Sequence, residues 1–501
     1  MFVRTKRNQS GTVSVQVVDK SSGSYKVIKT IGSSSDQDQV GNMMLQAREF
    51  IMNFKGQQTL SFGAPDDSAF FDKVYHSIRD VRMVGPELVL GKIFDLVGFG
   101  SIPESLFRHL VISRLIYPVS KLKTIDYLQK YKGVSLHVNE VYRFMDRFHK
   151  DYMELAKKIS YNHTVGVLGE DFGMVFYDVT TLYFEAADDD DYRISGFSKD
   201  GKHSNPQIVL GLLVGRNGYP LDYEAFQGNS FEGHTMLPVI ERFKAKYRIG
   251  NLTVVADAGL MSNRNVALLA GNGYEFILGG RIKNENEETK RKILDLGLSD
   301  QGFAELKRED GNRLIVQYSA SRAAKDAKNR EKGMERLKKR LASGKLSKKH
   351  INNKGYNKYL KLEVTISIDE EKYQADSLWD GLKGYVTNTV VPAEQVMEDY
   401  RQLWQIERTF RITKTDLKIR PVFHFKKRRI EAHLSISFVA CKIYKELERQ
   451  LKEKKTGMSA EKALEVLKTI FGITLTMPSG EEKLMILDKT FEQKSILEHF
   501  K

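Results

Sequence analysis

Short apolar runs rich in β-branched and aromatic residues recur along the middle of the chain, which is typical of neighbouring strands. Several are apolar at every position, so we expect a sheet that is covered on both faces. Residues 237–247, "LPVIERFKAKY", instead have helical periodicity and predict a crossover from an antiparallel group to a parallel strand. The pattern predicts an α/β fold with a mixed five-stranded sheet flanked by helices. The predicted strands are 174–184, 208–214, 221–227, 252–257 and 274–280.

The N-terminal third of the chain shows two other patterns. "TVSVQVVD" and "YKVIKTIG", separated by "KSSGS", predict a hairpin of short strands and hence a small β appendage. From about residue 76, apolar residues recur at three and four spacing, which predicts a helical domain. Within it, residues 121–148 fit a helix-turn-helix, with Gly133 in the turn and Ser135 as the N-cap of the second helix. An αα-hairpin with no role in reading DNA fits the same residues.

Residues 281–390 interrupt the α/β rhythm, and helical periodicity returns over 393–450. Part of the interruption, 322–354, carries thirteen Lys or Arg against three Asp or Glu. Such a run is either the exposed face of a solvated helix or a contact for nucleic acid. The predicted parts are a β-rich appendage at 1–75, a helical DNA-binding domain at 76–165, two halves of the α/β core at 166–280 and 391–450, an inserted domain at 281–390 and a C-terminal tail at 451–501.

Composition indicates which kind of partner and which cellular compartment to expect. The chain has 79 Lys and Arg against 64 Asp and Glu, a net charge of +15 that favours a polyanion such as nucleic acid. Cys441 is the single cysteine, which excludes an intramolecular disulfide and a cysteine-rich zinc site. His203, His424 and His433 lack metal-ligand spacing, which favours ordinary polar packing or a phosphate contact. No secretory leader or long apolar run is visible, so we expect a cytoplasmic protein with no membrane partner.

Two aspartates are notable for their places in the predicted strands. Asp178 lies in the middle of "GMVFYDVTTLYFE", where strand residues continue on both sides, so it does not cap a helix. A buried carboxylate costs several kcal/mol unless a Lys or Arg, hydrogen bonds or a cation neutralise it. Asp257 ends the strand of "LTVVADAGL", at the strand end where catalytic groups of α/β folds gather. It also fits as the cap of a helix that opens near Ser262 or Asn263.

A third carboxylate lies in "YRQLWQIERTFRITK", residues 400–414. At about 100° per residue, Tyr400, Glu407 and Lys414 form one stripe of a helix, and Arg411 lies beside it. A second stripe, which would pack on the sheet, consists of Leu403, Ile406, Phe410 and Leu417. Glu407 therefore lies at the rim of the buried face, either over the sheet edge or in an ordinary surface pair with Arg411.

Together these segments resemble the DDE insertion-sequence transposases, in particular the insertion-sequence-four superfamily. That superfamily has a β-rich insertion before the third acid and a Tyr…Glu…Lys signature on the last catalytic helix. The resemblance covers most of residues 165–445. It implies an RNase-H-like core interrupted by the inserted domain, and a transposase that cleaves the ends of an insertion sequence and joins the 3′-OH ends to target DNA. The motifs that carry it are "FYDVTTLYFE", "ADAGLMSNRN", "YRQLWQIERTFRITK", "YSASRAAKDAKNREK", "DGLKGYVTN" and "RPVFHFKKRRIEAHLSISFVA".

The resemblance also implies a catalytic role for the three acids. Asp178, Asp257 and Glu407 would be the catalytic residues and the ligands of two Mg²⁺ ions, for which Mn²⁺ substitutes. Hard cations take carboxylate oxygens, and two of them activate the attacking oxygen and relieve charge on the leaving oxygen. The signature arginine is missing because Leu403 occupies its position. Arg401 or Arg411 would replace it.

Double-stranded DNA is the expected partner, both as terminal inverted repeats and as target, and pairing of two ends implies a homodimer in the DNA-bound complex. Cations and a hydroxyl on one helix stripe, here Tyr400, Arg411 and Lys414, would hold phosphates of the transferred strand. The rival interpretation is an RNase-H-fold DNA-binding protein or nuclease without strand-transfer activity. The residues expected to follow flanking DNA are Lys426, Lys427, Arg428 and Arg429.

Overall fold

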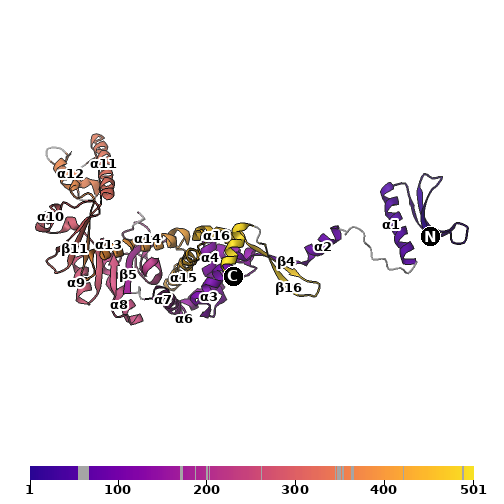
Figure 1. The fold of residues 1–501 in the computed structure, drawn as a ribbon, viewed down its shortest axis with the longest axis horizontal. Helices are drawn as coiled ribbons and strands as arrows, with labels where there is room; N and C mark the ends of the chain where they lie inside the picture. The colour runs from indigo at the N-terminus through magenta and orange to yellow at the C-terminus, as the bar shows by residue number, and fades with distance from the viewer. Residues whose placement is uncertain are drawn as a thin grey trace. The chain divides into compact units, whose positions relative to one another are not determined.

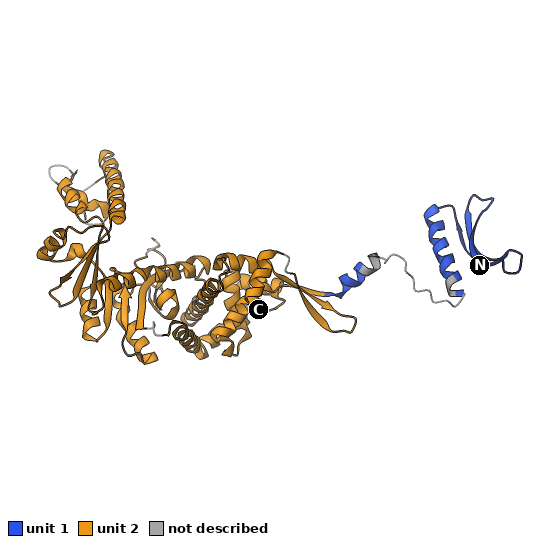
Figure 2. Cartoon of the chain, in the orientation of Figure 1, with its two compact units in different colours: residues 1–78 blue, residues 79–501 orange. Residues whose placement is uncertain are grey.

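A computed structural model gives the architecture of most of the chain. Its residues fall into two compact units, Met1–Ile78 and Arg79–Lys501, which Figure 2 distinguishes by colour. The residues that the structure describes are 1–54, 67–169, 173–186, 188–198, 201, 203–260, 262–344, 346, 351–352, 355–362, 366–420, 422–487 and 490–501.

The first unit contains a three-stranded antiparallel sheet and a long helix. Val15 and Val17 of the central strand and Ala47 of the helix are fully buried in a small shared core. The predicted hairpin is confirmed as β2 and β3, whereas a first strand and the helix were not predicted. A short sheet needs such a cover to bury one face. The elements are β1 (Phe2–Arg7), β2 (Val13–Asp19), β3 (Lys26–Ser34), α1 (Gln37–Phe54) and α2 (Asp67–Ser77).

The second unit is built on a mixed sheet of eight strands in the order β10-β11-β14-β9-β8-β5-β6-β7. Figure 1 labels β11 and β5 of this sheet. The first three strands in the chain pair antiparallel, and β8 then runs parallel to both β5 and β9. The predicted crossover is confirmed as α8 (Met236–Tyr247). All five predicted strands are present, as β5 (Met174–Tyr183), β6 (Gln207–Val214), β7 (Pro220–Gln227), β8 (Thr253–Ala256) and β9 (Glu275–Gly280).

The sheet is nevertheless larger than predicted, because the segment 281–390 adds three strands to it. β14 pairs antiparallel with β9, and Thr387 Oγ1 donates to the carbonyl of Phe276 at 2.6 Å. Without β14, β9 would be an edge with unpaired backbone groups. The number of five strands was therefore wrong, and the proposed domain boundaries stay predictions. The elements of this segment are α10 (Glu287–Leu294), β10 (Phe303–Lys307), β11 (Arg313–Tyr318), α11 (Ala320–Ala342), β12 (Leu360–Leu362), β13 (Ile366–Ile368), α12 (Glu370–Ser377) and β14 (Leu382–Thr387).

Helices cover both faces of the sheet, as the apolar strands predict. Every second residue of β5, here Val175, Tyr177 and Val179, points into the core under α8 and α9 (Asn263–Gly271). The alternate residues Phe176 and Leu182 face the larger core, which also holds residues of the helices before and after Gln402. The helices on this second face are α13 (Ala393–Arg401), α14 (Leu403–Arg411) and α15 (Lys427–Glu453).

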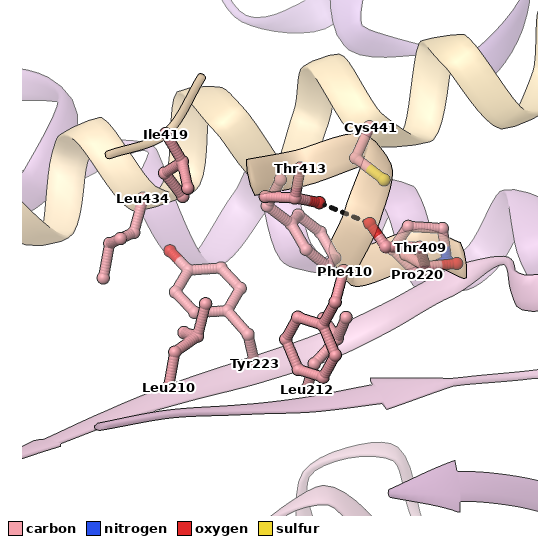
Figure 3. A pocket seen from close by; sticks show the side chains of 11 residues that line it. Leu210, Leu212, Pro220, Tyr223, Thr409, Phe410, Thr413, Ile419, Leu434 and Cys441 are labelled. Atoms are coloured by element: carbon pink, nitrogen blue, oxygen red, sulfur yellow. Dashed lines mark hydrogen bonds between the residues drawn. The ribbon is translucent and has the colours of Figure 1, made fainter. Parts of the chain in front are cut away.

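A small enclosed cavity of about 20 Å³ shows how α14 packs on the sheet (Figure 3). Leu212 of β6 lies next to Phe410, Tyr223 of β7 points toward Leu434 and Ile419, and Thr413 Oγ1 donates to the carbonyl of Thr409 at 2.8 Å. Cys441 closes the cavity from α15, and burial raises the pKa of its thiol to about 11. This packing fixes α14, which carries Glu407, over β5, β6 and β7 at one side of the sheet.

A helical layer packs around α15. Within it, the predicted helix pair is confirmed, and Gly133 ends the first helix with a left-handed φ of 65°. The N-cap of the second helix is His137 rather than Ser135, because the His137 side chain accepts from Asn139 N–H and Glu140 completes a capping box. The helices are α3 (Lys92–Val97), α4 (Ser105–Ile116), α5 (Lys121–Lys132), α6 (Val138–Asp151) and α7 (Met153–Leu168).

Residues after 451 are folded, although the sequence predicted only a tail. Leu467 and Ile496 are buried in the same core as α15. Two of their strands form a sheet with β4 (Ile78–Met83) in the order β16-β15-β4, in which β15 pairs with β4. Of the helices that the structure describes, none combines the length and apolar character needed to cross a membrane. The elements are α16 (Ala460–Lys468), β15 (Phe471–Thr476), β16 (Glu482–Leu487) and α17 (Phe491–His499).

Asp146 ties α6 to α15 and gives a first prediction. It accepts hydrogen bonds from Arg429 at 2.9 Å and from Arg428 at 2.8 Å, and these bonds, led by that of Arg429, hold its pKa well below the ordinary 3.8. A depressed carboxyl pKa stabilises the fold above the unfolded value, and this stability is lost as the pH falls through the folded pKa.

We expect Asp146→Asn to lower the free energy of unfolding at pH 7 by about 1 kcal/mol, because the pair is partly exposed. The difference from the parent chain should shrink as the pH falls below about 4. Urea unfolding between pH 7 and pH 2 measures both effects. Asp151→Asn, an exposed change at the end of the same helix, is the control. A difference that is independent of pH would contradict the charge-based explanation.

Candidate active site

Asp178 and Asp257 lie side by side on neighbouring parallel strands. β5 and β8 pair with Tyr177 opposite Ala256, so the next residue of each strand is an aspartate. Paired strands lie about 4.8 Å apart. Phe176 and Val255, two residues before the aspartates, are buried in the core under α13 and α14, so both aspartates alternate to that face. The sheet therefore brings two carboxylates, 79 residues apart in sequence, to one place.

Asp178 occupies the mid-strand position that its sequence predicts. It is half-buried, and its Oδ1 accepts the backbone N–H of Val179 at 2.7 Å. On the other side, β6 places the apolar Leu212 opposite it. The strand thus holds this carboxylate in a fixed direction within an otherwise apolar surface.

Asp257 follows the end of β8 and is exposed. Ser262, not Asp257, caps α9, because Ser262 Oγ accepts from Asn265 N–H at 3.1 Å. The alternative of a helix cap is therefore excluded. Instead, Asp257 Oδ1 accepts a hydrogen bond from the hydroxyl of Tyr400 at 3.1 Å.

Tyr400 positions Asp257 from α13. Its side chain is only 6% exposed. Burial, followed by the charge of Asp257, raises the pKa of the hydroxyl above its usual value, so the hydroxyl stays protonated and remains a donor. Gly279 allows this contact, since a Cβ there would lie 2.4 Å from the Tyr400 hydroxyl oxygen. The Tyr400 hydroxyl thus contacts a carboxylate, and its contact to a DNA phosphate stays a prediction.

Glu407 is exposed on α14, next to the buried Ile406. Its charge acts together with that of Asp257 on Tyr400 and on Lys383 of β14, which places the two acids in one electrostatic neighbourhood. Within the described part of the chain, Glu407 forms no ion pair with Arg411, so the surface pair is not formed. The predicted apolar stripe is confirmed by the burial of Leu403, Ile406, Phe410 and Leu417.

The single helix predicted over 400–414 is divided. α13 ends at Arg401, α14 begins at Leu403, and a π-helical turn (Ile412–Asp416) follows. Such a turn adds a residue and changes the direction of the side chains after it. The predicted stripe is therefore interrupted twice. The break at Gln402 separates the buried Tyr400 from the exposed Glu407, and the π-helical turn lies between Glu407 and Lys414. The Lys414 ammonium lies 5.9 Å from the centre of the Phe410 ring.

The other residues predicted to contact DNA differ in whether they already form an ion pair within the protein. Arg401 pairs with Glu398 at 3.0 Å, whereas Arg411 is exposed at the end of α14. Lys426 and Lys427 are exposed at the start of α15. The next two residues, Arg428 and Arg429, are bound to Asp146.

A basic groove that the sequence did not reveal lies beside Asp257. It has a volume of about 420 Å³ and is lined by Tyr400 and by four cations from three different elements. The Lys383 ammonium lies 4.4 Å from the centre of the Tyr400 ring, and the charges of Asp257 and Glu407 act on it. Burial, followed by the charge of Arg322, lowers the pKa of Lys383 to about 8. The four cations are Arg281, Lys283, Arg322 and Lys383.

The donor groups of the three acids suit a hard cation. Carboxylate oxygens are the ligands that Mg²⁺ and Mn²⁺ prefer, and Asp178 and Asp257 present them at neighbouring positions. Glu407 is the third acid on the same face. Among the described residues, no three His, Cys, Asp or Glu side chains are grouped closely enough to hold a metal ion. The donor chemistry therefore fits a hard cation, while a site with all three acids as ligands would require them to come closer together.

Comparison with known proteins assigns the chain to a family. A transposase DDE domain model matches residues 174–441, more than half of the chain, and this range contains all three acids. The chain therefore belongs to the transposase DDE domain family. Its class is that of the DNA transposases. No curated protein matches the chain.

Two solved structures are similar to the chain at low identity. The piggyBac transposase in a synaptic complex with hairpin DNA is 8% identical over 79% of both chains, with a TM-score of 0.36. The Mos1 transposase in a paired-end complex with the left transposon end is 11% identical over 46% of this chain and 66% of that chain, with a TM-score of 0.15.

Proposed function

We propose that the chain cleaves phosphodiester bonds at the ends of an insertion sequence and joins the 3′-OH ends to target DNA. The proposal includes an RNase-H-like catalytic core and membership of the insertion-sequence-four superfamily. The observation that carries it is the adjacency of Asp178 and Asp257 on parallel strands, beneath the helix that bears Glu407. These residues lie within the matched transposase domain.

Asp178, Asp257 and Glu407 would hold two divalent cations, Mg²⁺ or Mn²⁺. When bound, such ions supply an activated oxygen nucleophile and stabilise charge on the leaving oxygen. Tyr400 orients Asp257 through its hydroxyl and is a positioning residue. Leu403 is part of the core, so Arg401, Arg411 or the cations of the basic groove would have to supply the charge of the signature arginine.

Double-stranded DNA is the proposed substrate, as element ends and as target. The net charge of +15 supports a polyanionic partner. Synapsis of two ends would require a homodimer in the DNA-bound complex. The rival function, a nuclease without strand transfer, shares the same acids and differs only in the fate of the 3′-OH end.

Strand cleavage of labelled element ends tests the proposal. We expect cleavage and joining in Mg²⁺ or Mn²⁺, neither in EDTA, and a loss of at least about 1,000-fold in Asp178→Asn and Asp257→Asn. Asp188→Asn, an exposed change in the loop after β5, is the matched control and should keep full activity. Cleavage without joined products would favour the nuclease. Activity of the parent chain in EDTA would reject the metal-dependent mechanism.

Lys383 gives a prediction for the basic groove. Lys383→Met keeps the length of the side chain but removes its charge, so we expect about tenfold weaker binding of element ends and an unchanged fold. A mobility shift at fixed salt measures the affinity. Lys307→Met, an exposed change on β10 of the same sheet, should bind like the parent chain. Equal affinities of the two variants would exclude a DNA contact at Lys383.

A further inference from the structure

A second basic cavity, with none of the three acids in its lining, lies where the helical layer meets the loop after α14. It has a volume of about 570 Å³, within the range of ligand sites, and no Asp or Glu is among the described residues that line it. We call it the interhelical basic pocket. Its polar lining includes Arg114, Lys121, Lys418, Arg420, His424 and His433.

Two cations of this pocket are buried. Arg114 at the end of α4 is 5% exposed, and Lys121 at the start of α5 is 6% exposed. Arg114 Nη1 donates only a long hydrogen bond, 3.4 Å, to the carbonyl of Leu417. Across the described residues, neither side chain forms an ion pair. Burial, followed by the charge of Arg114, lowers the pKa of Lys121 well below its usual value.

Two histidines of the pocket lie next to these buried cations. His433 is 5% exposed, and its Nδ1 is buried with no hydrogen-bond partner in the described structure, while Nε2 lies 3.1 Å from the carbonyl of Ile419. The rings of His424 and His433 are 5.4 Å apart. Burial, followed by the charge of Lys121, lowers the pKa of His424 to about 3. An anion in the pocket would offset the repulsion of the neighbouring cations, but not the effect of burial.

Buried cations without counter-charge cost several kcal/mol, and proteins retain such an arrangement where a ligand supplies the missing charge. A guanidinium beside an ammonium suits the oxygens of a phosphate. The walls formed by Tyr142 and Phe423 are aromatic and suit a sugar or base next to that phosphate. The pocket is also larger than a lone phosphate requires. These features favour a phosphate that belongs to a nucleic acid strand.

We propose that the interhelical basic pocket binds a backbone phosphate of a DNA strand that also passes the catalytic acids. The nature of the strand rests on the proposed transposase function. The excess of buried positive charge, which no described carboxylate offsets, rests on the structure alone.

The pocket is tied to the strand that carries Asp178. Phe184, just beyond β5, forms a parallel bridge with Val422 of the pocket loop, and Val422 N–H donates to the carbonyl of Tyr183 at 3.5 Å. Six residues of extended chain separate Asp178 from Phe184, about 20 Å at about 3.3 Å per residue. A DNA strand advances about 3.4 Å per nucleotide, so about six nucleotides span the two sites.

Lys121→Met tests this assignment, because methionine fills the volume of lysine without its charge. We expect about tenfold weaker binding of element ends and a salt slope smaller by about one. Without DNA, the variant should unfold at the same or a higher temperature, since an uncompensated buried charge is removed. Lys130→Met, an exposed change on the same helix, is the matched control and should leave affinity and unfolding unchanged. Arg114→Gln should weaken binding in the same direction.

Inorganic phosphate separates the sources of the anion. If phosphate raises the unfolding temperature of the parent chain but Lys121→Met binds DNA normally, the pocket takes free phosphate and the DNA assignment is overturned. If Lys121→Met is less stable and binds DNA normally, the lysine is structural and the proposal is also overturned. All binding measurements are made without metal. Failure of the parent chain to cleave in Mg²⁺ would therefore contradict only the proposed transposase function. The affinity of Lys121→Met for DNA would still test whether the pocket binds a DNA phosphate.

Discussion

Replacement of Glu407 by glutamine should abolish strand cleavage, by at least about 1,000-fold, while binding of uncleaved element ends persists or tightens. The amide keeps the size of the side chain but removes the charge that would hold a hard cation. The loss of negative charge also reduces repulsion of the DNA backbone. Because Glu407 is exposed and forms no ion pair among the described residues, the fold should tolerate the change.

The assay is cleavage of labelled terminal DNA in Mg²⁺ or Mn²⁺, beside a mobility shift without metal. Glu394→Gln is the matched control, since it changes an exposed glutamate in the first turn of the neighbouring helix α13. It should cleave like the parent chain. Robust cutting by Glu407→Gln would remove Glu407 from the proposed metal site and return it to an ordinary surface position.

Lys414→Ala should behave differently, although the residue lies only seven positions further along the chain. A phosphate contact contributes to holding DNA rather than to the chemical step. We therefore expect binding weaker by about 1–3 kcal/mol and slower, still metal-dependent, cleavage. The contrast between the two variants separates chemistry from positioning on adjoining helical segments.

The strands of the core were predictable because each is a short apolar run with its own boundaries. The crossover helix 237–247 was also predictable from local sequence, because its 3.6-residue periodicity differs from that of the strands. The addition of β14 to β9 was not predictable, because edge pairing depends on which strand is left open once the whole sheet has formed. The same holds for β10 and β11.

The three acids could be identified from local sequence, but their convergence could not. It depends on the register that places Tyr177 opposite Ala256, a relation between strands far apart in the chain. Lys383 was missed because a lysine in a short strand carries no signal until β14 lies next to Asp257. Lys121 was missed because, in its helix, its charge predicts exposure and only the tertiary structure buries it.

Affinity for duplex DNA should fall steeply with salt. The chain carries a net charge of +15. Groups of basic residues line the groove beside Asp257 and the interhelical basic pocket, and others lie at the start of α15. Each phosphate neutralised adds about −0.9 to the slope of log affinity against log salt concentration. We expect a slope of −3 or steeper, a loss of at least about 60-fold between 50 and 200 mM salt. A shallower slope leaves too few phosphate contacts for the proposed function.

Two cations near the start of α15 allow a more specific test of which residues contact phosphates. Lys426→Gln should reduce the magnitude of the slope by about one, because Lys426 is exposed and available to a phosphate. Arg429→Gln should change it little, because the Arg429 guanidinium is bound to Asp146 at 2.9 Å and would have to leave that carboxylate to reach DNA. The two variants remove the same charge from positions three residues apart, so nonspecific electrostatics predicts equal effects. Equal slopes would show that DNA displaces Asp146 from Arg429, whereas unequal slopes in the expected order would show that the link between α6 and α15 persists in the complex.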